Sequence, residues 1–364
     1  MKKIDFCSPV FLRWALFLGA FLALSGCTAE KPAEEPKAIT LMAWNLHNLF
    51  DGVDDGDEYS EFLQAAGWSA EKYKGRLNSI SSAIGKIEPS PDIMIFEELE
   101  SLVILEDLAL VLPKGYLWAH FAKNNGSAIG LGILSRLPMV DVKAHSINIY
   151  GDVIPRPVLE ARFQTEDGDF LVFACHWKSK IGDSDVTENI RMASARVILR
   201  RIREVWESEP EVGVIVAGDL NENYDEFYRQ GSKRICALVP DDPVSFSLSN
   251  VNTAGQKDFI VISGNKPPLP VHFPEGTISL FSPWMSDLEN GSFFYKNDWE
   301  TIDHFLISGQ FWDNSGWEYE GAFVANFEPF ANSNGVPVPY NSRSGFGLSD
   351  HLPLIVTLRL VGGD

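Results

Sequence analysis

Apolar residues in this chain are grouped into short runs that stop on polar or turn-forming residues, as is typical of buried strands. Longer stretches at 71–87 and 187–207 instead space their apolar residues as on one face of a helix, and a shorter helix is expected at about 103–110. The strands are expected at 39–46, 93–96, 116–122, 127–134, 140–149, 158–164, 170–176, 212–217, 292–295, 301–307 and 352–360.

The order of these elements indicates the fold class. Strands and helices alternate at first, paired strands follow, and a helix and strands return. This order predicts an α+β fold of two packed mixed β-sheets flanked by helices, built as one domain. Residues 230–280 are rich in Pro and Gly without a clear period, so we expect a long irregular segment there.

The first residues have the layout of an export signal. Lys2, Lys3 and Arg13 precede the apolar stretch 14–24, which is too short to span a bilayer as a mature helix. It ends in Leu24-Ser25-Gly26-Cys27, which resembles the lipobox of bacterial lipoproteins. We therefore expect residues 1–27 to be a lipoprotein signal peptide with Cys27 lipidated, and 28–38 to be a flexible tether. An ordinary signal or a hydrophobic anchor is the alternative.

This reading predicts an exported protein, anchored by lipid to a bacterial membrane and facing the periplasm or the cell exterior. Export permits a disulfide between Cys175 and Cys236 but does not require one. The four cysteines form no metal-binding pattern.

The formal net charge of −20 limits the possible partners. Such an acidic chain repels polyphosphate at long range, which argues against a protein that holds nucleic acid on a basic face. It does not argue against a phosphate-cutting enzyme whose positive charge is a bound metal.

Candidate chemistry lies where the apolar runs end. Gly218-Asp219-Leu220-Asn221 follows the run 212–217, and alone such a stretch is often only an Asx turn. Many runs end this way, however, and burying several carboxylates together is costly without a cation. Oxygen ligands favour Mg²⁺ or Mn²⁺ over zinc. The residues concerned lie within or just past such runs and are Asn45, Glu98, His176, Asp219, Asn221, Asp303, Asp350 and His351.

These strand ends resemble, in order, the motifs of the endonuclease/exonuclease/phosphatase superfamily. The superfamily includes pancreatic deoxyribonuclease-like nucleases, abasic-site endonucleases, sphingomyelinases and inositol-phosphate 5-phosphatases. The resemblance covers about residues 39–360 and implies a four-layer α/β/β/α sandwich, with 39–362 as the catalytic domain. The motifs are Trp44-Asn45-Leu46, Phe96-Glu97-Glu98, residues 132–138, residues 175–179, Gly218-Asp219-Leu220-Asn221, Ile302-Asp303-His304 and Ser349-Asp350-His351.

The resemblance implies a role for each site residue. Glu98 would bind the metal with Asn45 and Asp350 beside it, and the ion would be Mg²⁺ or Mn²⁺, with Ca²⁺ possible. Asp219 would deprotonate the attacking water, while Asn221 and His176 donate hydrogen bonds to the phosphate. His351, held cationic by Asp303, would stabilise the transition state. Glu97 stands where the family usually has Gln, and it is expected to add negative charge beside the metal.

Three functions remain open. The first is a metal-dependent nuclease, with DNA or RNA as the phosphodiester substrate and no protein partner implied. The second is a phospholipid or inositol-phosphate phosphoesterase of the same fold, and the third is a non-catalytic surface-binding lipoprotein. Two further features are expected to be minor: Arg191 could reach a phosphate, and the acidic stretch 54–58 lacks the distal Glu of a Ca²⁺ loop and is read as solvated.

Overall fold

A computed structural model describes residues 38–113, 115–149, 151–154, 156–232, 234–241, 259–267 and 278–361. The expected signal peptide, Cys27 and tether residues 28–37 lie outside the described residues. In the part that is described, no helix combines the length and apolar character needed to cross a membrane.

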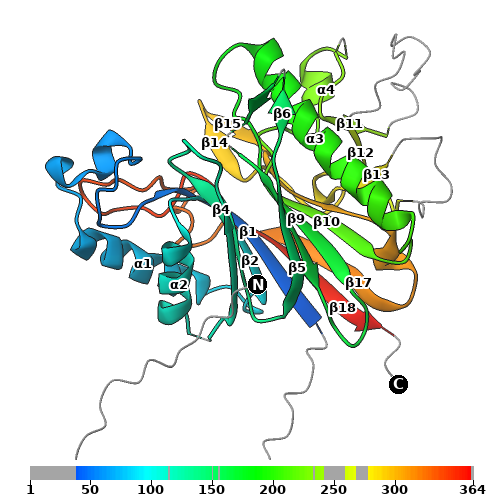
Figure 1. The fold of residues 1–364 in the computed structure, drawn as a ribbon, viewed down its shortest axis with the longest axis horizontal. Coiled ribbons are helices and arrows are strands. Elements are labelled where there is room, and N and C mark those ends of the chain that lie inside the picture. The colour runs from blue at the N-terminus through cyan, green and yellow to red at the C-terminus, as the bar shows by residue number, and fades with distance from the viewer. Residues whose placement is uncertain are drawn as a thin grey trace, which may run out of the picture.

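Two large mixed sheets form the centre of the protein (Figure 1). The first has six strands in the order β17-β18-β1-β2-β4-β3, and the second has eight in the order β11-β12-β13-β16-β10-β9-β8-β5. The strands of the first sheet are β1 (Ala38–Leu49), β2 (Ile93–Leu99), β3 (Trp118–Ala122), β4 (Gly130–Ser135), β17 (Gly316–Val324) and β18 (Leu354–Val361). Those of the second are β5 (Met139–His145), β8 (Val158–Phe163), β9 (Phe170–His176), β10 (Gly213–Asp219), β11 (Leu238–Pro240), β12 (Ile260–Ser263), β13 (Ser279–Phe281) and β16 (Asp303–Ile307).

Two small pairs and the helices complete the fold. The pairs are β6 (Asn148–Ile149) with β7 (Asp152–Val153), and β14 (Phe293–Tyr295) with β15 (Asp298–Glu300). The α-helices are α1 (Ala70–Ile84), α2 (Leu102–Val111), α3 (Ser184–Trp206) and α4 (Glu226–Arg229). The 3₁₀ turns are η1 (Ser60–Phe62), η2 (Gln64–Ala66), η4 (Pro283–Met285) and η5 (Gly309–Trp312).

Side-chain caps fix the starts of the main helices. Ser69 accepts a hydrogen bond from the backbone N of Lys72 at the start of α1. Asp183 accepts from the backbone N of Asp185 and of Val186 at the start of α3. Such caps satisfy backbone donors that lack a partner in the first turn.

The alternation of side chains along the strands divides the apolar residues into three cores. In β1, Met42, Trp44 and Leu46 face the layer that contains α1 and α2. Ile39, Leu41 and Ala43 face the second sheet. The other face of the second sheet packs on α3 (Figure 1). Helices, sheet, sheet and helix therefore form the four predicted layers, and the predicted fold class is confirmed.

Two sequence expectations about the fold are wrong, and one open question is answered. The segment 230–280, expected to be irregular, contributes β11, β12 and β13 to an edge of the second sheet. The prediction missed β17, which is an edge strand with mostly half-exposed residues and so lacks a clear apolar alternation. The pairing of Cys175 with Cys236, which the sequence left open, does not occur, because both cysteines are free and buried.

Candidate active site

The predicted strand-end residues meet at one edge of the layer between the sheets. In the second sheet Asp219 pairs with His176 on β9 and with Asp303 on β16. In the first sheet Asn45 of β1 pairs with Glu97 of β2. Each of these residues continues the alternation that places its strand's apolar side chains between the sheets. Polar groups from both sheets therefore converge where the inter-sheet core ends.

The regular alternation of side chains along the strands breaks at Glu98, because the backbone is irregular there. The pairing between β1 and β2 shifts register after Asn45 and Glu97. His47, Asn48 and Glu98 have positive φ angles of 53°, 62° and 62°. Positive φ costs energy for residues other than glycine and persists where the surroundings enforce it, often at functional sites.

Arg76 of α1 holds this irregular segment in place. Its guanidinium is buried and donates to the carbonyl oxygens of Leu46, His47 and Asn48, at 2.5, 2.8 and 2.7 Å. Its Cζ also lies 3.8 Å from the centre of the Tyr340 ring. Arg76 is thus a positioning residue that the sequence interpretation missed, because a single arginine on a surface-helix pattern gives no signal of its role.

Asp219 lies at the centre of the cluster. Its Oδ1 accepts from the backbone N of Asn221 at 2.9 Å, and its Oδ2 accepts from Asn45 Nδ2 at 3.1 Å. His176 Nε2 lies 3.6 Å from the same Oδ2. Burial raises the pKa of Asp219 to about 7, with Asp303 adding to the rise and His351 opposing it. A carboxylate that titrates near neutrality is suited to act as a general base.

His351 and Asp303 form a buried dyad. His351 Nδ1 donates to Asp303 Oδ2 at 2.8 Å, and Ser292 Oγ donates to the same oxygen at 2.5 Å. Burial alone would lower the pKa of His351, but the carboxylate of Asp303 raises it well above the usual value. His176 differs, because burial and Arg156 hold its pKa well below the usual range. One histidine is therefore cationic and the other neutral at neutral pH.

A cavity of about 360 Å³ opens onto these groups. Asn45 and Asp303 lie beneath it and bond to Asp219 and His351 respectively. All eight predicted catalytic and metal residues are thus in or directly below one cavity, while their individual roles stay predictions. Those that line it are Glu98, His176, Asp219, Asn221, Asp350 and His351.

Residues 40–258 match the family described as Endonuclease/Exonuclease/phosphatase family. The chain belongs to this family. Membership implies metal-dependent phosphoesterase or nuclease activity, and enzymes of the family use divalent metals. A search of curated proteins finds no match.

Two solved TDP2 structures support the family's fold, and a bacterial structure is also similar, with a lower TM-score. Truncated TDP2 from Caenorhabditis elegans is 13% identical with a TM-score of 0.51, and the match covers 88% of this chain and 97% of that one. Selenomethionine TDP2 from C. elegans is also 13% identical with a TM-score of 0.50, covering 88% and 74%. An endonuclease/exonuclease/phosphatase family protein from Bacteroides thetaiotaomicron is 18% identical with a TM-score of 0.49, covering 88% and 94%. At these identities the likeness concerns the fold alone.

The carboxylates at the cavity fit the divalent metal that the family uses. Glu98 Oε2 accepts from the backbone N of Asn48 at 2.9 Å, while Oε1 lies 3.7 Å from His176 Nε2, too far for a hydrogen bond. Asp350 Oδ2 lies 3.8 Å from His47 Nε2. Both carboxylates line the cavity, and hard oxygen donors suit Mg²⁺ or Mn²⁺.

Asn45 has less freedom to bind a metal. Its Nδ2 donates to Asp219, and its Oδ1 accepts from the backbone N of His47 at 2.9 Å. Its observed contacts orient Asp219, and its metal role stays a prediction.

The sequence interpretation also missed other cavity residues, among them Arg156, Lys180, Phe293 and Tyr295. Arg156 donates to the carbonyl oxygen of Trp177, and Lys180 pairs with Glu226 and Glu300 at 2.7 and 3.0 Å. The Phe293 ring lies 4.7 Å from that of His351. Arg156 and Lys180 lie in connections, so no periodicity marks them, while Phe293 and Tyr295 fall in the expected strand 292–295, whose pattern gives no sign of a cavity.

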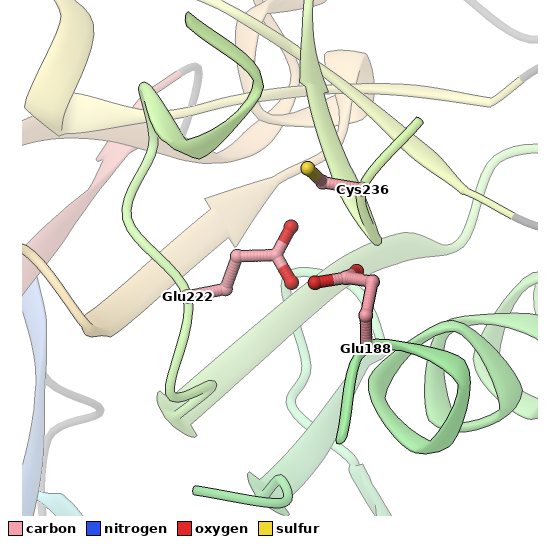
Figure 2. Close-up of side chains that lie close together, drawn as sticks. All are labelled: Glu188, Glu222 and Cys236. Carbon is pink, nitrogen blue, oxygen red and sulfur yellow. The ribbon is translucent and has the colours of Figure 1, made fainter. Parts of the chain in front are cut away.

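Arg191 does not reach the cavity, and its suggested phosphate contact is wrong. It donates to Glu188 Oε2 at 2.6 Å and to Glu222 Oε2 at 3.0 Å. The remaining oxygens of these two carboxylates accept from the backbone N of Ala237 and of Leu238. Figure 2 shows the two glutamates beside Cys236, an arrangement that could suggest a metal site. Because all four carboxylate oxygens are already bonded, the cluster instead ties the loop after Asp219 to α3 and β11.

The surroundings of Glu97 oppose the negative charge that its sequence position suggested. The side chain is fully buried, and neither carboxylate oxygen has a hydrogen-bond partner among the described residues. Burial, together with Asp303 and Asp219, raises its pKa well above the usual value. Burial therefore favours the neutral form of this carboxyl, which resembles the glutamine usual in the family.

Replacing Glu97 by glutamine should stabilise the fold in a pH-dependent way. The unfolded chain releases the Glu97 proton at a lower pH than the folded chain, so the free energy of unfolding falls as pH rises between the two pKa values. Thermal unfolding is measured in buffer with chelator at two pH values, one above neutrality and one below the ordinary glutamate pKa. We expect Glu97→Gln to raise the midpoint at the higher pH and to change it little at the lower pH. An equal shift at both pH values would contradict the assignment of a neutral Glu97.

Proposed function

We propose that this protein is a divalent-metal-dependent phosphodiesterase that hydrolyses nucleic acid outside the cytoplasm. The observation that carries the proposal is one cavity faced by a buried base, Asp219, a cationic acid, His351, and two metal-type carboxylates, Glu98 and Asp350. A base and a cation facing one space match the demands of phosphoester hydrolysis, in which a proton leaves the water as charge builds on the phosphate.

Each side chain at the cavity has a separate role in the proposed hydrolysis. Asn221 and neutral His176 donate hydrogen bonds to non-bridging phosphate oxygens. Asp219, fixed by Asn45 and by the backbone of Asn221, takes the proton of a water aligned with the leaving group. The imidazolium of His351 stabilises the charge of the transition state. A bound divalent ion would supply electrostatic stabilisation to the phosphate and increase the acidity of the water. Hydrolysis would proceed in line, without a covalent enzyme intermediate.

Aromatic and basic residues at the cavity favour a nucleic-acid substrate. Tyr295 is 51% exposed, and its ring stacks on Phe293 with centroids 6.1 Å apart and planes 21° from parallel. Such exposed rings can stack with bases, while Arg156 and Lys180 can contact phosphates. The retained site residues disfavour a surface-binding role without catalysis.

A phospholipid or inositol-phosphate substrate is the second candidate, because a lipid anchor would place the domain at a membrane. A substrate panel separates the candidates: plasmid DNA, RNA, sphingomyelin, a soluble phosphoinositide and a chromogenic diester, each with Mg²⁺ and with EDTA. We expect plasmid or RNA cleavage that EDTA abolishes and Mg²⁺ or Mn²⁺ restores. Cleavage of lipid without cleavage of nucleic acid would overturn the proposed substrate. Inactivity on all five would favour a binding protein.

We also propose that the protein is exported and anchored through lipid on Cys27. The support is the sequence of residues 1–27 described above. When the full chain is expressed in a bacterium with labelled palmitate, wild-type protein should carry label and sediment with membranes. Cys27→Ser should lose the label, while Cys7→Ser, which alters a residue inside the signal, should retain it. Label that persists in Cys27→Ser would contradict the anchor.

A further inference from the structure

A second group of carboxylates lies outside the active-site cavity, beside the start of the chain segment that joins β1 to α1. Asp55 and Glu58 belong to this segment, and Glu100 follows β2 directly. One oxygen of each residue lies within 4.8 Å of one oxygen of each of the other two. The sequence predicts that the acidic stretch 54–58 is solvated because it lacks a distal glutamate, but the fold supplies a glutamate from a distant part of the chain.

Glu100 is the observation that distinguishes this group from an ordinary acidic surface. Its side chain is 2% exposed. Oε2 accepts from the backbone N of Asp51 at 2.8 Å, but Oε1 is buried and has no hydrogen-bond partner among the described residues. A buried carboxylate oxygen without a partner is costly, and such an atom calls for an unseen ligand.

The loop geometry accounts for the position of Glu58 but gives the group no directly paired cation. Glu58 accepts from the backbone N of Asp55 and of Gly56, at 2.6 and 2.9 Å, which closes a tight turn at Gly56 with φ 110°. The nearest ion pair joins Lys123 to Asp57 at 3.8 Å. In the described ranges no lysine or arginine pairs with Asp55, Glu58 or Glu100. Three acidic side chains thus converge without an ion pair to a lysine or arginine.

We propose that Asp55, Glu58 and Glu100 bind a structural Ca²⁺ ion, separate from the catalytic metal. The donors are all carboxylate oxygens, which excludes the softer metals that prefer nitrogen and sulfur. Asp55 is exposed and Glu58 is half-buried, so water can complete the coordination of Ca²⁺, which takes six to eight oxygen ligands in flexible geometry. Mg²⁺ demands a near-ideal octahedron, which a turn and a strand end from separate segments are less able to provide.

This ion would stabilise one wall of the catalytic site. Glu100 lies two residues after Glu98 and bonds back to the segment through Leu49 O and Asp51 N. Trp68 Nε1 also donates to the carbonyl oxygen of Asp51, which joins the segment to the aromatic core beneath it. A cation shared by Asp55, Glu58 and Glu100 would therefore fix the segment between β1 and α1 to the end of β2, which carries Glu98.

Calcium binding can be measured without relying on activity. The catalytic site is first disabled with Glu98→Gln and Asp350→Asn, and the chelator-treated protein is titrated with CaCl₂ by calorimetry and by thermal unfolding. We expect one Ca²⁺ per chain and a midpoint that rises with Ca²⁺ concentration, because a ligand that binds only the folded state stabilises it. No heat of binding and no shift in midpoint would overturn the proposal.

Three variants in this background locate the ion. Asp55→Asn and Glu100→Gln should each weaken Ca²⁺ binding by about 10- to 100-fold or more. Changing a residue that only supports a metal ligand already costs this much, and these residues are the ligands themselves. Asp57→Asn, a matched change in the same loop outside the group, should bind Ca²⁺ like its parent. Glu100→Gln should retain its midpoint in chelator, so that lost binding is not confused with misfolding. Unchanged binding in Asp55→Asn and Glu100→Gln, or equal loss in Asp57→Asn, would refute the site.

Discussion

Replacing Asp219 by asparagine is expected to lower kcat by about 10²- to 10⁴-fold, the usual contribution of a positioned general base. The midpoint of thermal unfolding in EDTA should stay the same or rise, because burial opposes the ionised form of this carboxylate. Both quantities are measured on purified protein, with a chromogenic diester and Mg²⁺ for turnover. Loss of activity without loss of stability separates a chemical role from a structural one.

The pH dependence of the wild-type enzyme provides the control for this assignment. Asp219 must be ionised to accept a proton, and its pKa is raised to about 7, so activity should increase as pH rises through neutrality. A bound cation would favour the ionised form and move this limb to lower pH. If Asp219→Asn has a kcat close to that of the wild type, Asp219 is not the general base.

Replacing His351 by glutamine should lower kcat by about 10²- to 10³-fold, as expected for loss of one donor that stabilises transition-state charge. Glutamine can still donate a hydrogen bond, but it cannot carry the positive charge that Asp303 stabilises on the imidazole. The binding of substrate should change less than kcat, because the charge on the phosphate increases in the transition state. Steady-state kinetics with the chromogenic diester separate kcat from KM.

Asp303→Asn tests the same pair through its effect on pH. His351 has to stay protonated, so the alkaline limb of activity follows its pKa. Because Asp303 raises that pKa, its removal should move the alkaline limb to lower pH, whereas a purely structural role would lower activity at every pH alike. An unmoved alkaline limb would show that His351 does not act as the cation.

Much of the site could be predicted because the strands are regular. Period-two alternation places Asp219 on the same face as Ile215 and Ala217, and His176 on the same face as Val172 and Ala174. Once neighbouring strands pair, such residues must lie side by side at the sheet's edge. The pattern of polar residues at strand ends is therefore sufficient to predict the core of the site from the sequence.

The rest depends on contacts between segments that carry no local pattern. Arg156 and Lys180 lie in connections, and their approach to the cavity follows from how those connections close over the sheets. The neutral state of Glu97 depends on complete burial between the sheets, which a single position in a strand does not disclose. Glu100 is similar, since only the folded chain places it beside Asp55.

The division of the site between strands and connections affects how its specificity can change. Asp219 and His176 end their strands and Asp303 begins the strand that pairs with them, so moving one would disturb the pairing of its neighbours. Arg156, Lys180 and Tyr295 belong to the sheet's connections and a small hairpin, where insertions and exchanges are better tolerated. Changes in the connections and the hairpin could therefore adapt the cavity to new leaving groups, while the residues on the paired strands that carry out hydrolysis stay the same.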